Sequence, residues 1–227
     1  MKPAQPAEGL AARILDALPQ TQCQRCGYAD CAAYADAIAQ GTAAINQCPP
    51  GGQSGIERLS AICAQPFQTL NPAYGVEGPR HLAVIEEAWC IGCTLCIEAC
   101  PTDAILGANK RMHTVIEPHC TGCELCVPVC PVDCIQMEPV NPDATGWAAW
   151  SRADADKARA RYAFRQQRLL KRDQTQAQRN AARAEAKLAD LATHSRIRDA
   201  EQLDRKRSII EAALARARQK RADSGGA

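Results

Sequence analysis

The sequence predicts an α+β chain with a small helical domain, a small β-containing domain and a long helical or partly disordered C-terminal tail. Two identical cysteine patterns recur thirty positions apart, and a third cysteine set lies upstream among short helical segments. From about residue 147 the chain is rich in Ala, Arg, Gln and Lys, with no Gly until Gly225. We therefore expect domains at 8–64 and 80–140, a linker at 65–79 that contains Pro and Gly, and a tail at 147–227.

The upstream domain is expected to be helical. The segment AARILDAL places Ile14, Leu15 and Leu18 on one face, and Pro19 ends the pattern. A second short helix is expected to follow Cys31 and to stop at Gly41, since glycine suits the end of a helix.

The repeated pattern predicts the chemistry of the second domain. The four cysteines of each copy read C-x2-C-x2-C-x3-C-P, at Cys90, Cys93, Cys96 and Cys100, then at Cys120, Cys123, Cys126 and Cys130. This is the signature of bacterial two-cluster ferredoxins, which bind [4Fe–4S] clusters. A zinc site fits a C-x2-C-x2-C triplet poorly, because structural zinc sites usually pair two separate C-x2-C knuckles. Each copy is expected to form a strand, a cysteine loop, a short helix and a second strand.

In two-cluster ferredoxins the fourth cysteine of each run binds the other cluster. The expected ligands of cluster 1 are therefore Cys90, Cys93, Cys96 and Cys130. Those of cluster 2 are Cys120, Cys123, Cys126 and Cys100. We expect Gly92 and Gly122 to let each loop approach its cluster closely, and Trp89 to shield a cluster from water.

The upstream set has a less specific spacing. Its members, Cys23, Cys26, Cys31 and Cys48, would by themselves also fit a four-cysteine zinc knuckle. Beside a two-cluster domain, a third [4Fe–4S] cluster is the favoured interpretation, which gives about three clusters. The two remaining cysteines, Cys63 and Cys134, are expected to be small buried residues, and His113 is expected at a loop or strand edge and not as a ligand.

Composition, charge and motifs limit the classes of protein to which the chain could belong. Residues 1–150 carry 7 Lys or Arg and 15 Asp or Glu, whereas residues 151–227 carry 20 and 10, so an acidic body precedes a basic tail. No apolar run is long enough for a membrane span, and no signal peptide is evident, so we expect a cytoplasmic protein. Clustered cysteines indicate metal ligands in a reducing compartment more than disulfides. There is no G-x-G-x-x-G or Walker loop and no catalytic constellation.

Three segments resemble the B subunit of the Rnf-type (Rsx) electron transport complex. They read ILDALPQTQCQRCGYADCAAYADAIAQGTAAINQCPPGG, CIGCTLCIEACPTDAILGANKRMHTVI and CTGCELCVPVCPVDCIQMEPV. The resemblance implies one cluster on the upstream set, a two-cluster ferredoxin domain after it, and electron transfer to or from subunits of a membrane-bound oxidoreductase complex. The family typically begins with a hydrophobic anchor, which is not seen before these cysteines, and the basic tail is outside the family pattern.

We expect an electron carrier, or a non-catalytic subunit of an oxidoreductase complex, that passes electrons between redox partner proteins. One alternative is an integral subunit held at the inner face of the cell membrane by other subunits. The other is an iron–sulfur protein that binds nucleic acid through its basic tail, which is disfavoured because acidic residues interrupt the bases and only Tyr162 and Phe164 could stack.

Overall fold

The structure, a computed structural model, describes residues 9–224. The chain divides into two units, the first ending at Arg165 and the second beginning at Gln166. Residue 8 of the expected upstream domain and residues 225–227 of the expected tail lie outside the described residues.

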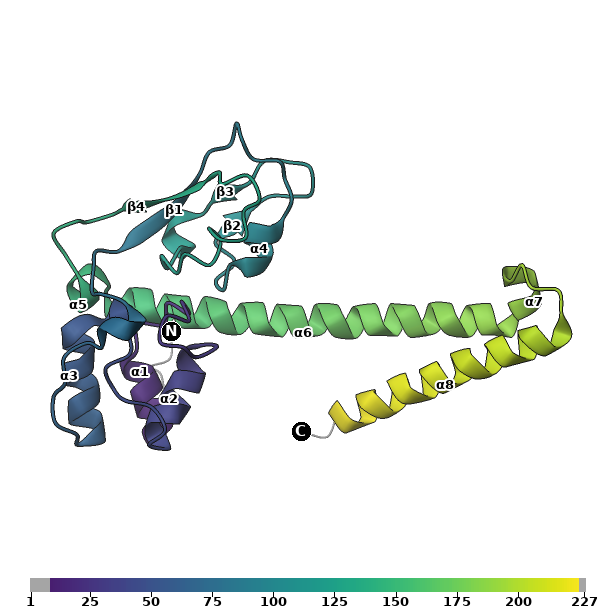
Figure 1. The fold of residues 1–227 in the computed structure, drawn as a ribbon, viewed down its shortest axis with the longest axis horizontal. Coiled ribbons are helices and arrows are strands. Elements are labelled where there is room, and N and C mark those ends of the chain that lie inside the picture. Colours follow the sequence, from purple (N-terminus) through teal and green to yellow (C-terminus); the bar gives the residue numbers. More distant parts are fainter. Residues whose placement is uncertain (1–8, 225–227) are drawn as a thin grey trace. The chain divides into compact units, whose positions relative to one another are not determined.

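Three helices form the N-terminal part of the first unit (Figure 1): α1 (Leu10–Ala17), α2 (Cys31–Ala39) and α3 (Gly52–Cys63), with 3-10 turns at Pro49–Gly51 and Pro72–Tyr74. Helix α1 forms where the apolar spacing predicts it, and Ile14 is fully buried. Helix α2 begins at Cys31 because the Asp30 side chain accepts a hydrogen bond from the Ala33 amide at 2.7 Å.

The cysteine repeat forms two small antiparallel sheets. They are built from β1 (His81–Ile85), β2 (Ile105–Leu106), β3 (Thr114–Val115) and β4 (Ile135–Pro139). Strand β1 pairs with β4, and β2 pairs with β3, so the outer strands of the two copies meet and the inner strands meet. This pairing joins both copies into one folded body.

The two copies differ in their short helical segments. Copy one contains the short helix α4 (Leu95–Ala99), whereas the corresponding residues 125–129 of copy two form turns, with a 3-10 turn (Glu117–His119) ahead of them. The expectation of a short helix in both copies is therefore wrong for the second. In both copies the residue just before this segment is left-handed: Thr94 has φ of 68° and Glu124 has φ of 64°.

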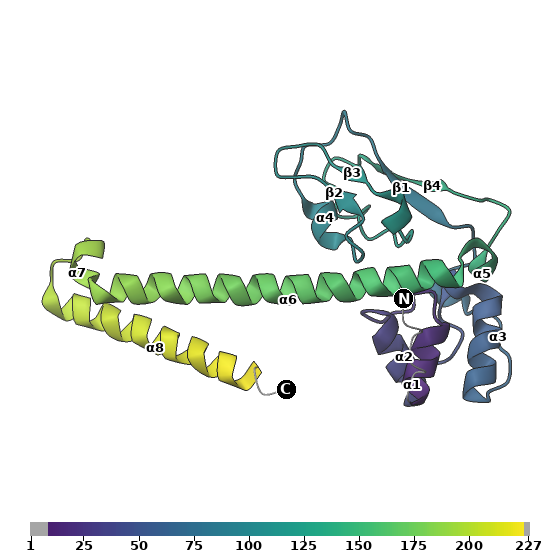
Figure 2. The same cartoon turned by 180° about the vertical axis from the view of Figure 1, so that it is seen from behind.

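The first unit continues beyond the repeat. Helix α5 (Gly146–Ala149) is followed by α6 (Arg152–Ala189), whose first turns run between the α1–α3 helices and the sheets in both Figure 1 and Figure 2. Trp150 is 6% exposed and donates its indole N–H to the Pro19 carbonyl oxygen at 2.8 Å. Ala155 and Ala158 are buried. The residues expected to begin the tail thus complete the body that holds the cysteines.

The second unit consists of the remainder of α6 together with α7 (Leu191–His194) and α8 (Ala200–Ser224). Arg218 of α8 forms an ion pair with Glu185 of α6 at 2.8 Å, and Leu191 and Leu214 are buried. No helix in the described part of the chain combines the length and the apolar composition needed to cross a bilayer.

Candidate iron–sulfur centres

The upstream cysteines converge between α1 and α3. Cys23 and Cys26 lie in the turn after α1, Cys31 is the first residue of α2, and Cys48 precedes a 3-10 turn. The Gln22 side chain accepts a hydrogen bond from the Cys31 amide at 2.9 Å, which ties the turn to the helix.

Burial and mutual repulsion act on these thiols together. Burial, and then the neighbouring Cys23 and Cys31, raise the pKa of Cys48 well above its usual value. Burial raises the pKa of Cys31 to about 12, and Cys23 and Cys26 add to the effect. Three buried thiols and the partly buried Cys23, within reach of one another, disfavour thiolates unless a cationic centre lies among them. The donor set therefore fits an iron–sulfur cluster, which binds cysteines as thiolates.

The second run gathers a cysteine from the first. Cys100, Cys120, Cys123 and Cys126 line one small cavity together with Ala83 and Met137. Burial, followed by Cys123, Cys120 and Cys100, raises the pKa of Cys126 to about 12. The Ala104 amide donates a hydrogen bond to the Cys100 sulfur at 3.1 Å. Convergent sulfurs and an N–H···S bond are what a cluster site requires.

The first run is linked to the second through Cys134. Burial, and then Cys93 and Cys90, raise the pKa of Cys96 to about 11. The sulfur of Cys130, from the other run, lies 3.5 Å from that of Cys134. Cys134 in turn interacts electrostatically with both Cys130 and Cys90. Cys134 thus links Cys130, the last cysteine of the second run, to Cys90 of the first run.

Glycine is required in both loops by backbone crowding. A Cβ atom on Gly92 would lie 2.5 Å from the Arg111 nitrogen, and one on Gly122 would lie 2.5 Å from the His81 oxygen. Both residues also have positive φ, near 69° and 68°. The close approach that these glycines permit is to another segment of the chain.

Within residues 9–224 no three His, Cys, Asp or Glu side chains lie close enough together to bind a single metal ion. A [4Fe–4S] cluster spaces its ligand sulfurs more widely than one ion does, because four iron atoms lie between them.

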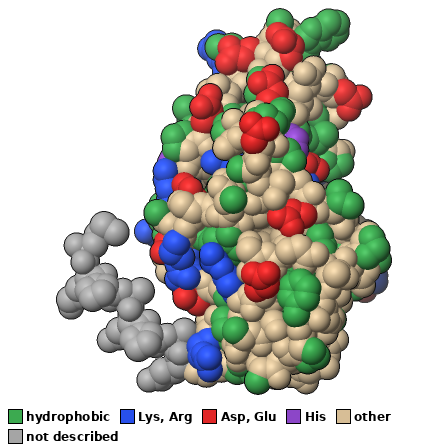
Figure 3. Space-filling view, turned by 90° about the vertical axis from the view of Figure 1, so that its left-hand side faces the viewer, with side chains coloured by type: hydrophobic (Ala, Val, Ile, Leu, Met, Phe, Trp, Pro, Cys, Tyr) green, Lys and Arg blue, Asp and Glu red, His purple; other side chains and the backbone are tan. Residues whose placement is uncertain are grey.

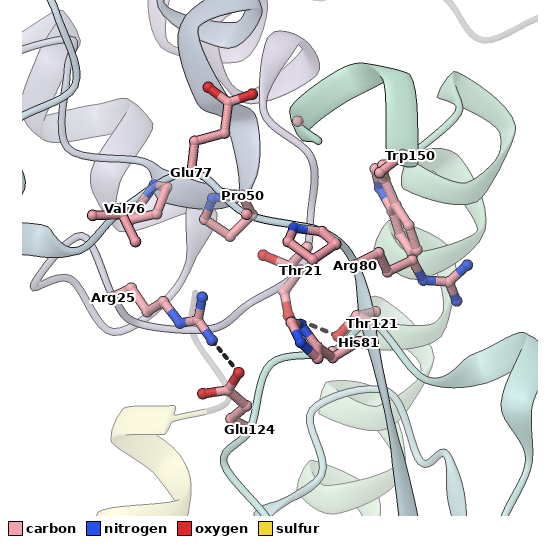
Figure 4. Close-up of a pocket in the computed structure, with 16 residues that line it drawn as sticks. Thr21, Arg25, Pro50, Val76, Glu77, Arg80, His81, Thr121, Glu124 and Trp150 are labelled. Carbon is pink, nitrogen blue, oxygen red and sulfur yellow. Dashed lines mark hydrogen bonds and ion pairs between the residues drawn. The ribbon is translucent and has the colours of Figure 1, made fainter. Parts of the chain in front are cut away.

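Polar contacts join the part formed by α1–α3 to the part formed by the cysteine repeat. The Thr121 hydroxyl donates to the Thr21 carbonyl oxygen at 2.9 Å, and Arg25 forms a 2.6 Å ion pair with Glu124. Figure 4 shows both contacts at the edge of a pocket that Trp150 also lines. Thr121 is next to Cys120, and Thr21 is two residues from Cys23, so this junction lies between two cysteine sets.

Helix α6 contacts the loop that carries Cys100. Arg161 donates to the carbonyl oxygens of Thr102 and Asp103 at 2.6 and 3.0 Å. Arg165 donates to the Glu98 carbonyl oxygen and lies 3.5 Å from the Asp103 carboxylate. On the opposite side, Tyr162 donates to Asp30 at 3.0 Å.

The surface of the cysteine-bearing part carries acidic side chains. Figure 3 shows them spread over the upper part of one face, where the cysteine repeat and its sheets lie. Such a surface favours encounter with a basic partner, since complementary charge accelerates association.

The expectations for single residues had different outcomes. Trp89 lies in a turn and is 70% exposed, so its ring faces solvent. The prediction that Trp89 shields a cluster is therefore wrong. Cys134 is buried, as expected, whereas Cys63 at the end of α3 is only partly buried. His113, expected at a loop or strand edge, directly precedes β3 and is buried.

Two family comparisons agree with this geometry. Residues 83–137 match the family described as "4Fe-4S dicluster domain", and residues 18–50 match the family described as "Putative Fe-S cluster". Fold, cysteine arrangement and family matches define an iron–sulfur electron-transfer protein with a ferredoxin-like dicluster domain.

Similar proteins give the family. The B subunits of ion-translocating oxidoreductase complexes are 59% identical in Azoarcus sp. (strain BH72), 54% in Thiobacillus denitrificans and 52% in Alkalilimnicola ehrlichii. The matches cover 57%, 61% and 66% of this chain and 71%, 73% and 81% of those proteins. The chain belongs to this Rnf/Rsx B-type family. An electron-transfer role is favoured over nucleic-acid binding.

Proposed function

We propose that the chain carries three [4Fe–4S] clusters and passes electrons through them between redox partner proteins. Cluster 1 would be held by Cys90, Cys93, Cys96 and Cys130. Cluster 2 would be held by Cys120, Cys123, Cys126 and Cys100, and cluster 3 by Cys23, Cys26, Cys31 and Cys48. The clusters supply one-electron chemistry, and the chain supplies thiolates, hydrogen bonds and exclusion of water.

The observation that carries the proposal is the shared cavity of Cys100 with the second cysteine run. Cys100 is twenty positions before Cys120, yet it contributes to the same group of buried sulfurs. The Ala104 amide and the Cys100 sulfur form the N–H···S bond that stabilises negative charge on a ligand sulfur.

Support for cluster 3 comes from the mutual repulsion of its four thiols and from the family match over residues 18–50. The Thr121–Thr21 hydrogen bond and the Arg25–Glu124 ion pair would hold this site beside the ligand loop of cluster 2. We infer that these contacts fix the separation over which an electron passes.

The relatives are named as subunits of an ion-translocating oxidoreductase complex. We propose that this chain works with the other subunits of such a complex, as a peripheral subunit at the cytoplasmic face of the membrane. It would make and break no substrate bonds itself, and the domain limits 8–64, 65–79 and 80–140 would separate its helical part, its linker and its ferredoxin-like part.

The crossed ligands are tested by Cys100→Ser. Electron paramagnetic resonance (EPR) of the reduced full chain should show loss or alteration of the cluster on Cys120, Cys123 and Cys126, with the first-run signal retained. Cys63→Ser is the matched control, because Cys63 is a half-buried cysteine outside all three sets. Loss of the first-run signal in Cys100→Ser would mean that each run binds its own cluster.

Membership of a complex is tested in membranes of the native host. After a high-salt wash, the chain should remain with the membrane fraction and purify with other subunits in mild detergent. Complete release by salt would contradict stable assembly, since salt weakens exposed charge pairs.

A further inference from the structure

The two halves of the dicluster part are related residue by residue at a spacing of thirty. Thr94 and Glu124 share left-handed φ values of 68° and 64°, and Asp103 and Asp133 both have φ of 50°. The backbone donors are matched too. The Ala104 amide bonds the Cys100 sulfur at 3.1 Å, and the Cys134 backbone hydrogen-bonds Cys130.

One cross-strand pair breaks this symmetry by exchanging a large and a small side chain. Beside the cavity of the second run, Ala83 of β1 is the register partner of Met137 of β4. In the other half, His113 corresponds to Ala83 and Gly107 corresponds to Met137. His113 and Gly107 directly flank the Leu106–Thr114 pair of β2 and β3. The large side chain of one pair, Met137, thus corresponds to the glycine of the other pair, and the large His113 corresponds to an alanine.

His113 occupies its place because position 107 has no side chain. A Cβ on Gly107 would lie 2.1 Å from His113 Cδ2. The imidazole is only 1% exposed, and its Nδ1 lies 3.2 Å from the Cys96 sulfur. The ring therefore packs against glycine with one nitrogen directed at an expected cluster ligand.

A second departure from symmetry acts on the same site. Cys134, whose sulfur is 3.5 Å from the Cys130 sulfur, stands where the other half has Ala104. Both side chains that face the first site, His113 and Cys134, can donate a proton, and both counterparts, Ala83 and Ala104, cannot. The Thr121 hydroxyl, which approaches Cys123, donates its one proton to Thr21.

We propose that His113 and Cys134 are positioning residues that make cluster 1 easier to reduce than it would be with the alanines of the other half. This rests on the ligand sets proposed above. A cluster-bound cysteine has lost its proton, so its sulfur can only accept, and His113 Nδ1–H and Cys134 S–H must donate. One-electron reduction adds negative charge, with no bond made or broken, and donors to the sulfurs stabilise that charge.

The structure supplies matched variants, because alanine is the chain's own residue at both symmetry-related positions. Midpoint potentials of the full chain are measured by EPR-monitored redox titration, with the cluster 1 signal assigned as the one that Cys93→Ser alters. In His113→Ala the reduction equilibrium constant of cluster 1 should fall about tenfold, or about 59 mV for one electron. The midpoint potential of cluster 2 should not change. In the double variant, adding Cys134→Ala to His113→Ala should lower the midpoint potential of cluster 1 further.

His113→Asn is the rescue variant, since its amide nitrogen can take the place of Nδ1 as donor, and it should restore most of the potential. Met137→Leu is the control beside cluster 2 and should leave cluster 1 unchanged. An unchanged cluster 1 potential in both alanine variants, at full iron content, overturns the proposal. If His113→Ala does not fold, Cys134→Ala carries the test, because it removes a single sulfur atom. If instead Cys93→Ser alters neither dicluster signal, the ligand assignment itself has failed.

Discussion

Asp16 connects the N-terminal helices to the start of α6. Its carboxylate accepts hydrogen bonds from Arg152 and, at 3.0 Å, from Arg159. Arg152 holds the pKa of Asp16 below its usual value, with burial opposing and Arg159 assisting. A lowered pKa means that the folded state favours the charged form, so the contribution to stability is present above the unfolded pKa and is lost as the pH falls through the folded pKa.

We predict that Asp16→Asn lowers the free energy of unfolding by less than about 1 kcal/mol, because all three side chains are more than one-third exposed. Urea unfolding followed by tryptophan fluorescence should give the same difference at about pH 5.5 and pH 8, both above the unfolded pKa of about 3.9. A difference that shrank between those two values would contradict the assignment of the effect to Asp16.

Residue spacing alone predicted that the repeated cysteines are cluster ligands, because a cluster-binding loop needs its ligands at fixed separations along the chain. It did not predict His113, since its contact with Cys96 depends on the β2–β3 pairing and on the space left by Gly107. The prediction for Trp89 failed for a related reason. Adjacency to Cys90 in sequence does not determine which way a turn residue points.

At the scale of elements, α6 begins as a connector and only later becomes an exposed helix. Propensity predicts the helix but cannot predict that its first turns are packed, because these turns carry small alanines among charged residues and no stripe of large apolar side chains. The packing comes from Ala155 and Ala158, and from arginines that reach carbonyl oxygens in the Cys100 loop. Helix α3 was not predicted at all, and it begins just after the Cys48 turn, where Glu77 accepts from the Gln53 amide at 2.8 Å.

Arg161→Ala is predicted to lower the free energy of unfolding of the first unit by about 1–3 kcal/mol, because two loop carbonyls lose a charged donor. Arg172→Ala is the matched control in the same helix, since Arg172 forms an ion pair with its exposed neighbour Asp173. Equal effects of both substitutions in urea unfolding would rule out a specific role for Arg161.

At the scale of the whole molecule, the cysteine-bearing unit extends past the part of the chain that matches the dicluster family. It ends at Arg165, whereas the dicluster match ends at residue 137. The predicted α+β class agrees with the observed mixture of helices and small sheets. The extension of the body into the basic segment depends on tertiary contacts such as Trp150 with Pro19, which have no local sequence signature.

A chain ending at Arg165 is therefore predicted to retain its iron and its unfolding midpoint. A chain ending at Ala149 should unfold at lower urea, because it loses the buried Trp150, Ala155 and Ala158. Iron content and urea midpoints of both truncations check this, and equal stability would contradict a structural role for residues 150–165.

Iron and acid-labile sulfide per chain test the central claim of three four-cysteine clusters most directly. After anaerobic purification of the full chain, we predict about twelve iron and about twelve sulfide per chain, without zinc. About eight of each together with one zinc would contradict it, since the upstream cysteines would then bind a single ion.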